Sequence, residues 1–158
     1  MALTIGIGAD HAGKELKQLV VEMLKLSEHT AVDYGLAADC KTSVDYPDYA
    51  SSVAADVASG KLDAGILICG TGIGMQITAN KYPGIRAAVA WDELSAKLAK
   101  EHNNANILCL GARTTNHMRA TELVKIWLDT PFGGSRHQLR LDKIREVERK
   151  VSALASKH

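Results

Sequence analysis

The chain has 158 residues, of which 46% are hydrophobic and 23% charged, and its formal net charge is +1 at pH 7. This length suits one ordinary domain whose core needs neither disulfides nor a metal. So balanced a charge argues against a nucleic-acid or membrane surface as the main partner. Aromatic residues make up only 4% of the chain, so aliphatic side chains must fill the core.

Apolar residues alternate along the chain between short runs, typical of buried strands, and longer stretches with one apolar helical face. Strands are expected at residues 3–9, 30–34, 65–69, 86–90 and 106–110. Helices are expected at residues 13–25, 47–60, from the glycine turn at 70–74 to about 81, at 92–101 and at 117–128. In the helix at 92–101 we expect Asp92 as the cap, with Leu94 and Leu98 facing inward. The alternation predicts an α/β/α sandwich with a five-stranded parallel sheet.

The C-terminal stretch has a different pattern. Its apolar residues form a narrow stripe among charged ones, at Leu141, Ile144, Val147, Val151 and Leu154. Such a stripe predicts a helix over roughly 136–156 that packs on a second subunit, while residues 1–158 form a single domain. The first turn of this helix carries Arg136, His137 and Arg140, which can converge on a ligand or form a solvated basic turn.

The segment 65–77, GILICGTGIGMQI, places Cys69 at a strand end, ahead of Gly70, Gly72 and Gly74. A P-loop would need a lysine and another spacing, a dinucleotide fingerprint is matched only in part, and a thiol phosphatase would need an arginine where Met75 stands. What remains is a thiol beside backbone amides, which can stabilise an oxyanion and a thiolate. Inert packing of a buried cysteine is the alternative.

Other polar residues follow strands and should share the edge of the sheet where open α/β proteins bind ligands. Asp10 and His11 follow the first strand, although a helix cap and a surface imidazole would explain them equally well. Arg113 follows the fifth strand and suits a phosphate. His102 and Asn103 end a helix, where they could act in catalysis or simply satisfy terminal carbonyls.

The three cysteines lack the paired spacing of a disulfide or zinc framework, so we expect a reduced, cytoplasmic protein. The first residues do not read as a signal peptide, and no run approaches the roughly 18 apolar residues of a membrane span. The final Ser-Lys-His differs at its last position from the peroxisomal ending Ser-Lys-Leu, which disfavours that address.

Six segments, in order and over nearly the whole chain, resemble the type B ribose-5-phosphate isomerases of the RpiB/LacAB sugar-phosphate isomerase family. They are GADHAG (8–13), DYPDYA (45–50), ICGTGIGM (68–75), ANKYPGIRAA (79–88), HNNANIL (102–108) and GGSRHQLRL (133–141). The resemblance implies a Rossmann-like domain and a homodimer with active sites shared between subunits. It also implies interconversion of D-ribose 5-phosphate and D-ribulose 5-phosphate, a step of the non-oxidative pentose phosphate pathway, without metal or cofactor.

The resemblance also implies a role for each matching residue. Cys69 is the base that carries the proton, and His102 opens the sugar ring with help from Thr71. The residues that would hold the enediolate are Gly70, Thr71, Gly72, Ile73 and Gly74. Those that would orient the sugar are Asp10, His11, Tyr46 and Asn103, with Asp45 supporting their loop. Those that would surround the phosphate are Arg113 and, from the partner subunit, Arg136, His137 and Arg140.

Three alternatives stay open. Isomerases of allose 6-phosphate or galactose 6-phosphate belong to the same family, although the latter work as two different chains, whereas one chain here has both the cysteine and the basic tail. A non-catalytic mononucleotide-binding module would use the partial glycine fingerprints, including Gly6 and Gly8. Dimers could also pair into a dimer of dimers.

Overall fold

The computed structural model describes residues 1–37 and 39–156, so the last two residues of the Ser-Lys-His ending lie outside it. The strands form one parallel sheet in the order β2-β1-β3-β5-β4. They are β1 (Thr4–Ala9), β2 (Thr30–Asp33), β3 (Ala64–Cys69), β4 (Ala87–Val89) and β5 (Ile107–Gly111). The helices are α1 (Lys14–Lys25), α2 (Tyr46–Ala58), α3 (Ile73–Ala79), α4 (Glu93–Glu101), α5 (His117–Asp129) and α6 (Arg136–Ala155). The predicted elements are confirmed, with ends shifted by a residue or two in most.

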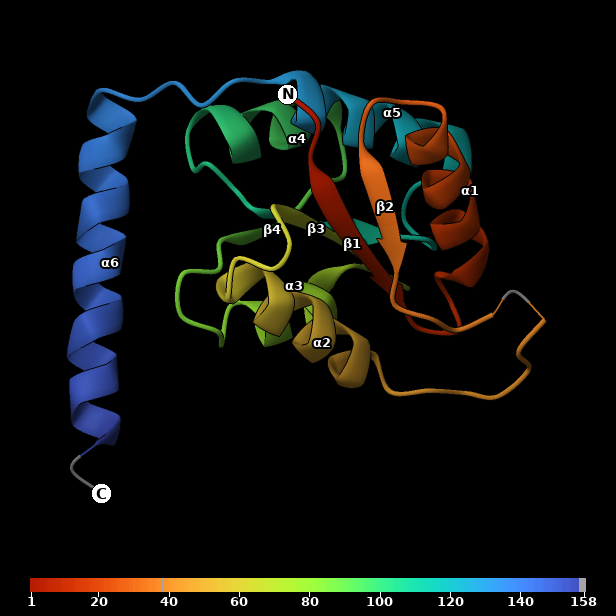
Figure 1. Cartoon of the computed structure of the whole chain (residues 1–158), viewed down its shortest axis with the longest axis horizontal. Coiled ribbons are helices and arrows are strands. Elements are labelled where there is room, and N and C mark those ends of the chain that lie inside the picture. Colours follow the sequence, from red (N-terminus) through yellow and green to blue (C-terminus); the bar gives the residue numbers. More distant parts are fainter. Residues whose placement is uncertain (38, 157–158) are drawn as a thin grey trace.

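The sheet is covered on both faces, as Figure 1 shows. Helices α1, α4 and α5 pack on one face, where Ile5, Leu108 and Trp127 are among the buried residues. Helices α2 and α3 pack on the other, around Val53 and Leu67. The protein is therefore the expected three-layer α/β/α sandwich, a Rossmann-like fold held by aliphatic side chains.

Gly6 and Gly8 of β1 have a packing role on the α2 face of the sheet. A Cβ atom on Gly6 would lie 2.5 Å from a methyl carbon of Leu62, and one on Gly8 would lie 3.2 Å from a methyl carbon of Val53. The two glycines let α2 and the segment after it approach the sheet closely. This packing accounts for a glycine pattern that had suggested a nucleotide.

Helix α4 begins as expected and faces the sheet differently. Asp92 caps it, because the Asp92 carboxylate accepts a hydrogen bond from the Ser95 N–H at 2.7 Å while the Ser95 hydroxyl bonds the backbone N–H of Asp92. The prediction that Leu94 faces inward is wrong, since its side chain is exposed. The buried residues of the helix are Ala96 and Ala99, whose small side chains bring α4 close to its neighbours.

Helix α6 stands to one side of the sandwich, joined to it by the segment after α5 (Figure 1). Only His137 and Leu141 of this helix are buried. Ile144, Val147, Val151 and Leu154 are exposed, so the apolar stripe expected there is real, except that Leu141 faces its own chain. Across the part of the chain that the structure describes, no helix is long and apolar enough to cross a membrane.

Candidate active site

A cleft of about 420 Å³ lies at the carboxyl edge of the sheet. After β1 the chain turns outward to β2, and it then returns to place β3 on the other side of β1, so strand order reverses between β1 and β3. Their ends are joined by a hydrogen bond from the Asp10 N–H to the Ile68 carbonyl at 3.2 Å. The cleft is lined by Asp10, Tyr46, Cys69, Gly70, Thr71, Ile73, Gly74, Ile77 and Arg113. It therefore occupies the position where open α/β sheets bind small ligands.

Cys69 is the last residue of β3 and lies at the floor of the cleft, with 5% of its surface exposed. Its Sγ accepts a hydrogen bond from the backbone N–H of Gly72 at 3.2 Å. Gly72 has a φ of 78°, and a Cβ atom there would lie 3.1 to 3.2 Å from the Leu110 backbone. Only glycine suits both the positive φ and the close backbone contact. The tight turn that points the Gly72 amide at the Cys69 sulfur therefore depends on this glycine.

Cys109 offers a contrast within the same sheet. It pairs with Leu67 in the register of β3 and β5, and it is fully buried. Burial, and to a smaller extent the nearby Cys69, raises the pKa of the Cys109 thiol far above its ordinary value. Because Cys109 stays a thiol and meets no solvent, it packs the core, whereas Cys69 faces the cleft.

Asp10 both fixes the turn after β1 and lines the cleft. Its Oδ1 accepts hydrogen bonds from the backbone N–H groups of Ala12 at 2.9 Å and Gly13 at 3.2 Å, so it caps the turn into α1. The residue is buried and also lines the cleft. Oδ1 of the carboxylate thus fixes the turn at the wall of the cleft.

His11 and Tyr46 join the loop before α2 to this edge of the sheet. The exposed His11 accepts a hydrogen bond at Nδ1 from the backbone N–H of Val44 at 3.2 Å. Asp45 is the residue before α2, and the structure gives its side chain no capping hydrogen bond. The Tyr46 ring lies over Gly74, where a Cβ atom would come within 2.5 Å of the ring. Gly74 therefore lets an aromatic side chain form one wall of the cleft.

Arg113 brings a positive charge to the cleft from the end of β5. Its backbone N–H donates to the carbonyl of Gly70 at 2.9 Å. Its side chain crosses Gly70, since a Cβ atom there would lie 3.1 Å from Nη1. The exposed guanidinium suits an anionic group such as a phosphate.

The remaining predicted residues lie elsewhere in the same chain. Helix α4 runs back from the carboxyl end of β4 to the amino end of β5, which places His102 and Asn103 at the opposite edge of the sheet from Cys69. There the His102 ring stacks on His137, near the start of α6, with centroids 4.1 Å apart and planes 17° apart. Figure 1 shows the start of α6 well away from the ends of β1 and β2. One chain thus holds the predicted site residues in two separate groups, one around the cleft and one where the end of α4 meets the start of α6.

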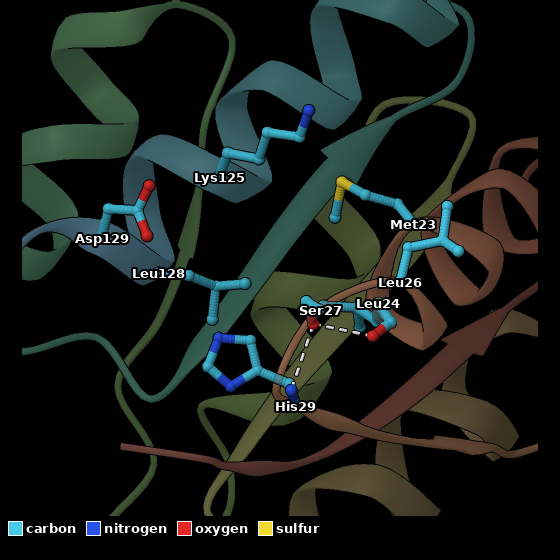
Figure 2. Close-up of a pocket in the computed structure, with 8 residues that line it drawn as sticks. All are labelled: Met23, Leu24, Leu26, Ser27, His29, Lys125, Leu128 and Asp129. Atoms are coloured by element: carbon cyan, nitrogen blue, oxygen red, sulfur yellow. Dashed lines mark hydrogen bonds between the residues drawn. The ribbon is translucent and has the colours of Figure 1, made fainter.

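A second cavity, of about 290 Å³, opens between the last turns of α1 and α5 (Figure 2). Its walls are mostly apolar, and the Ser27 hydroxyl there donates to the Leu24 carbonyl at 2.7 Å. None of the residues predicted for the site lines it.

The residue that sequence reasoning missed in the main cleft is Ile77, and its signal was its place one helical turn after Ile73.

Fold and cleft together define an α/β protein whose cleft, at the reversal of its strand order, suits a small, negatively charged ligand. The chain belongs to the Ribose/Galactose Isomerase family, whose model matches residues 5–144. Ribose-5-phosphate isomerase B of Escherichia coli is 42% identical over 146 residues, which are 92% of this chain and 97% of that protein.

Solved structures agree with this assignment. Ribose-5-phosphate isomerase B of Clostridium thermocellum is 47% identical, with a TM-score of 0.90 over 94% of this chain and 99% of its own. The enzyme of the same name from Mycoplasma genitalium, solved with bound ribulose 5-phosphate, is 41% identical, with a TM-score of 0.88 over 92% of this chain and 96% of its own.

Proposed function

We propose that this protein is a ribose-5-phosphate isomerase that interconverts D-ribose 5-phosphate and D-ribulose 5-phosphate. The observation that carries the proposal is Cys69, a thiol that lines the cleft and accepts a hydrogen bond from the Gly72 amide. Asp10 and Arg113 line the same cleft. The relatives named ribose-5-phosphate isomerase B, one of them holding ribulose 5-phosphate, support the substrate.

The reaction moves one proton between neighbouring carbons. The Cys69 thiolate takes the proton from C2 of the open aldose, and the C2–H electron pair forms the double bond of a cis-enediolate. The thiol then returns the proton to C1, while a proton passes from O2 to O1, and the ketose results. Amides of residues 70–74 stabilise the enediolate oxygens. These steps need no redox partner.

Ring opening comes first, because ribose 5-phosphate is mostly a closed furanose. We assign it to His102, which exchanges a proton with the ring oxygen and the C1 hydroxyl, with Thr71 assisting. Asp10, His11, Tyr46 and Asn103 orient the sugar, and Asp45 supports the loop that carries Tyr46. Arg113 and the arginines of α6 hold the phosphate.

These roles require two subunits, since His102 and Cys69 lie at opposite edges of the sheet in one chain. The exposed face of α6 supports a homodimer: Arg136, Arg140, Val147, Val151 and Leu154 follow at helical spacings of 4, 7, 4 and 3 residues. The phosphate-binding arginines thus continue the apolar stripe. Exposed Ile73 and Ile77 beside the cleft offer the stripe an apolar counterpart on the second copy.

We place the homodimer in the cytoplasm, because Cys40, Cys69 and Cys109 are free thiols in the described structure. Each subunit works as one domain, with α6 as its dimerisation helix. Pairing of dimers into tetramers is compatible with the same site.

A direct assay tests the proposal. Purified protein is given ribose 5-phosphate and, separately, allose 6-phosphate, with and without a chelator. We expect turnover of ribose 5-phosphate that exceeds turnover of allose 6-phosphate and survives the chelator. A preference for allose 6-phosphate would assign the site to six-carbon sugars, and the absence of turnover on either sugar would overturn the isomerase.

A further inference from the structure

The contact between His102 and His137 joins the end of α4 to the start of α6. The two imidazoles lie face to face, with centroids 4.1 Å apart and planes 17° apart. One face of the His102 ring is therefore covered by His137, although 35% of the His102 side chain stays exposed. The Glu101 carboxylate lies 3.6 Å from Nε2 of His102. The His102 ring is confined while it remains accessible.

The turn before α6 is fastened to the same corner. The Gly133 N–H donates to the Glu101 carbonyl at 2.8 Å, and the His137 N–H donates to the Gly134 carbonyl at 2.9 Å. A Cβ atom on Gly133 would lie 3.1 Å from both the Glu101 carbonyl oxygen and Cδ2 of His137. The backbone at Gly133 therefore passes close to the end of α4. This close approach places the His137 ring against the His102 ring.

His137 differs from the arginines on either side of it. Arg136 and Arg140 are exposed, whereas His137 has only 7% of its surface exposed. Burial, then the neighbouring His102, Arg136 and Arg140, lower the pKa of His137 below its ordinary value, and Glu101 opposes them. An imidazole that is buried and stacked on another ring presents little surface to a phosphate, whereas the exposed Arg136 and Arg140 are free to reach one.

We infer that His137 is a positioning residue, which stacks on the His102 imidazole and holds it in the orientation that ring opening requires. The inference rests on the proposed function and reassigns one residue within it. Removing the stacked ring frees His102 to rotate, and a misplaced acid–base group loses much of its effect without weakening substrate binding. Arg136 and Arg140 keep the phosphate.

The test compares His137→Ala, His137→Phe, Arg140→Ala and His102→Ala with the unmodified dimer. Each is assayed on ribose 5-phosphate and on ribulose 5-phosphate, which cannot close a furanose ring because its C5 oxygen is esterified. Inhibition by inorganic phosphate reports the phosphate subsite. Phe keeps a flat ring against His102 and can neither titrate nor bind phosphate, so it isolates the stacking contribution.

We expect His137→Ala to lower kcat on ribose 5-phosphate by about tenfold to a hundredfold, with KM and phosphate inhibition nearly unchanged. Ribulose 5-phosphate turnover should change far less, and His137→Phe should recover most of the loss. Arg140→Ala should instead raise KM and weaken phosphate inhibition. If His137→Ala fails to fold, His137→Leu replaces it as the variant without a ring.

Three results would overturn the inference: His137→Ala behaving like Arg140→Ala, equal losses on both substrates, or no recovery with Phe. The proposed function has separate controls in the same experiment. No turnover by the unmodified dimer would remove the isomerase, and equal losses on both substrates for His102→Ala would remove the ring-opening role. If those two controls behave as expected, an unexpected His137 result bears on the positioning role alone.

Discussion

At the scale of single residues, two similar side chains differ in whether they reach the cleft. Cys69 ends β3, and Cys109 lies within the neighbouring strand β5. Both residues lie in apolar runs of the sequence. The sequence identified Cys69 through the glycines after it. It could not show that one thiol lines the cleft and the other packs the core, because that depends on the burial of Cys109 between the layers and on the Gly72 amide that donates to Cys69.

This difference gives a matched pair of variants. We expect Cys69→Ala to lower kcat on ribose 5-phosphate by about a thousandfold while substrate still binds, because it removes the base that carries the proton. Cys109→Ala should keep turnover and lose about 1 kcal/mol of stability, since it leaves a small cavity in the core. Steady-state kinetics and urea unfolding of both variants check the pair. Retained turnover in Cys69→Ala would contradict the mechanism.

Tyr34 gives a pH dependence that is independent of catalysis. Burial, with the hydrogen bond to Asp56, raises the pKa of the Tyr34 hydroxyl to about 12 from its ordinary 10.0. The folded state therefore holds the phenol proton more tightly than the unfolded state does. This contribution to stability is complete below pH 10 and is lost as pH rises toward about 12.

We expect Tyr34→Phe to lower stability at neutral pH and to weaken the fall in stability above about pH 10, because the titrating group is gone. Urea unfolding at a series of pH values measures the difference from the unmodified protein. Tyr82→Phe serves as the control for losing a tyrosine hydroxyl. An unchanged slope in Tyr34→Phe would show that Tyr34 does not cause the alkaline loss.

At the scale of elements, the apolar pattern predicts the strands well, since their apolar runs are short and bounded by turn residues. It fails on the face of α4 at Leu94, which was expected inside and is exposed, while the smaller Ala96 and Ala99 are buried. Hydrophobicity favours the larger side chain, whereas close packing of a helix on a sheet favours the smaller one. That choice depends on the space between layers, which the sequence does not give.

Gly13 lets the start of α1 approach β3 closely, because it has no side chain. A Cβ atom there would lie 2.7 Å from the carbonyl oxygen of Ile68, which is backbone and cannot move aside easily. We expect Gly13→Ala to cost roughly 1 to 3 kcal/mol of stability, as overpacked sites generally do. Glu15→Ala, at an exposed position of the same helix, should cost little. Chemical denaturation of both variants measures the difference, and equal stability would contradict this packing.

At the scale of the whole molecule, the exposed apolar stripe of α6 and the separation of the predicted site residues into two groups point to a dimer. The sequence predicted the apolar stripe and the basic first turn. It could not predict that His102 stands with α6, because the position of His102 follows from the direction in which α4 returns across the sheet. That placement is the basis of the proposal that each active site uses residues of both subunits.

Charges on the stripe should therefore separate the subunits and stop turnover together. We expect Val147→Glu combined with Val151→Glu to give a monomer without isomerase activity, because burying two carboxylates in an apolar interface is costly. Arg149→Gln, on the opposite face of α6, changes the charge and should leave the dimer intact. Sedimentation and activity are measured on the same samples. A fully active monomer would refute the shared site.

Subunit mixing tests the shared site most directly. Cys69→Ala and His102→Ala proteins, each nearly inactive on ribose 5-phosphate, are mixed, unfolded and refolded together. In a mixed dimer with shared sites, one site contains both substitutions and the other contains neither. We predict a return of activity to about a quarter of the unmodified level, since half of the dimers are mixed and each has one intact site. No return of activity, with mixed dimers shown to form, would place each complete site within one chain and contradict the account.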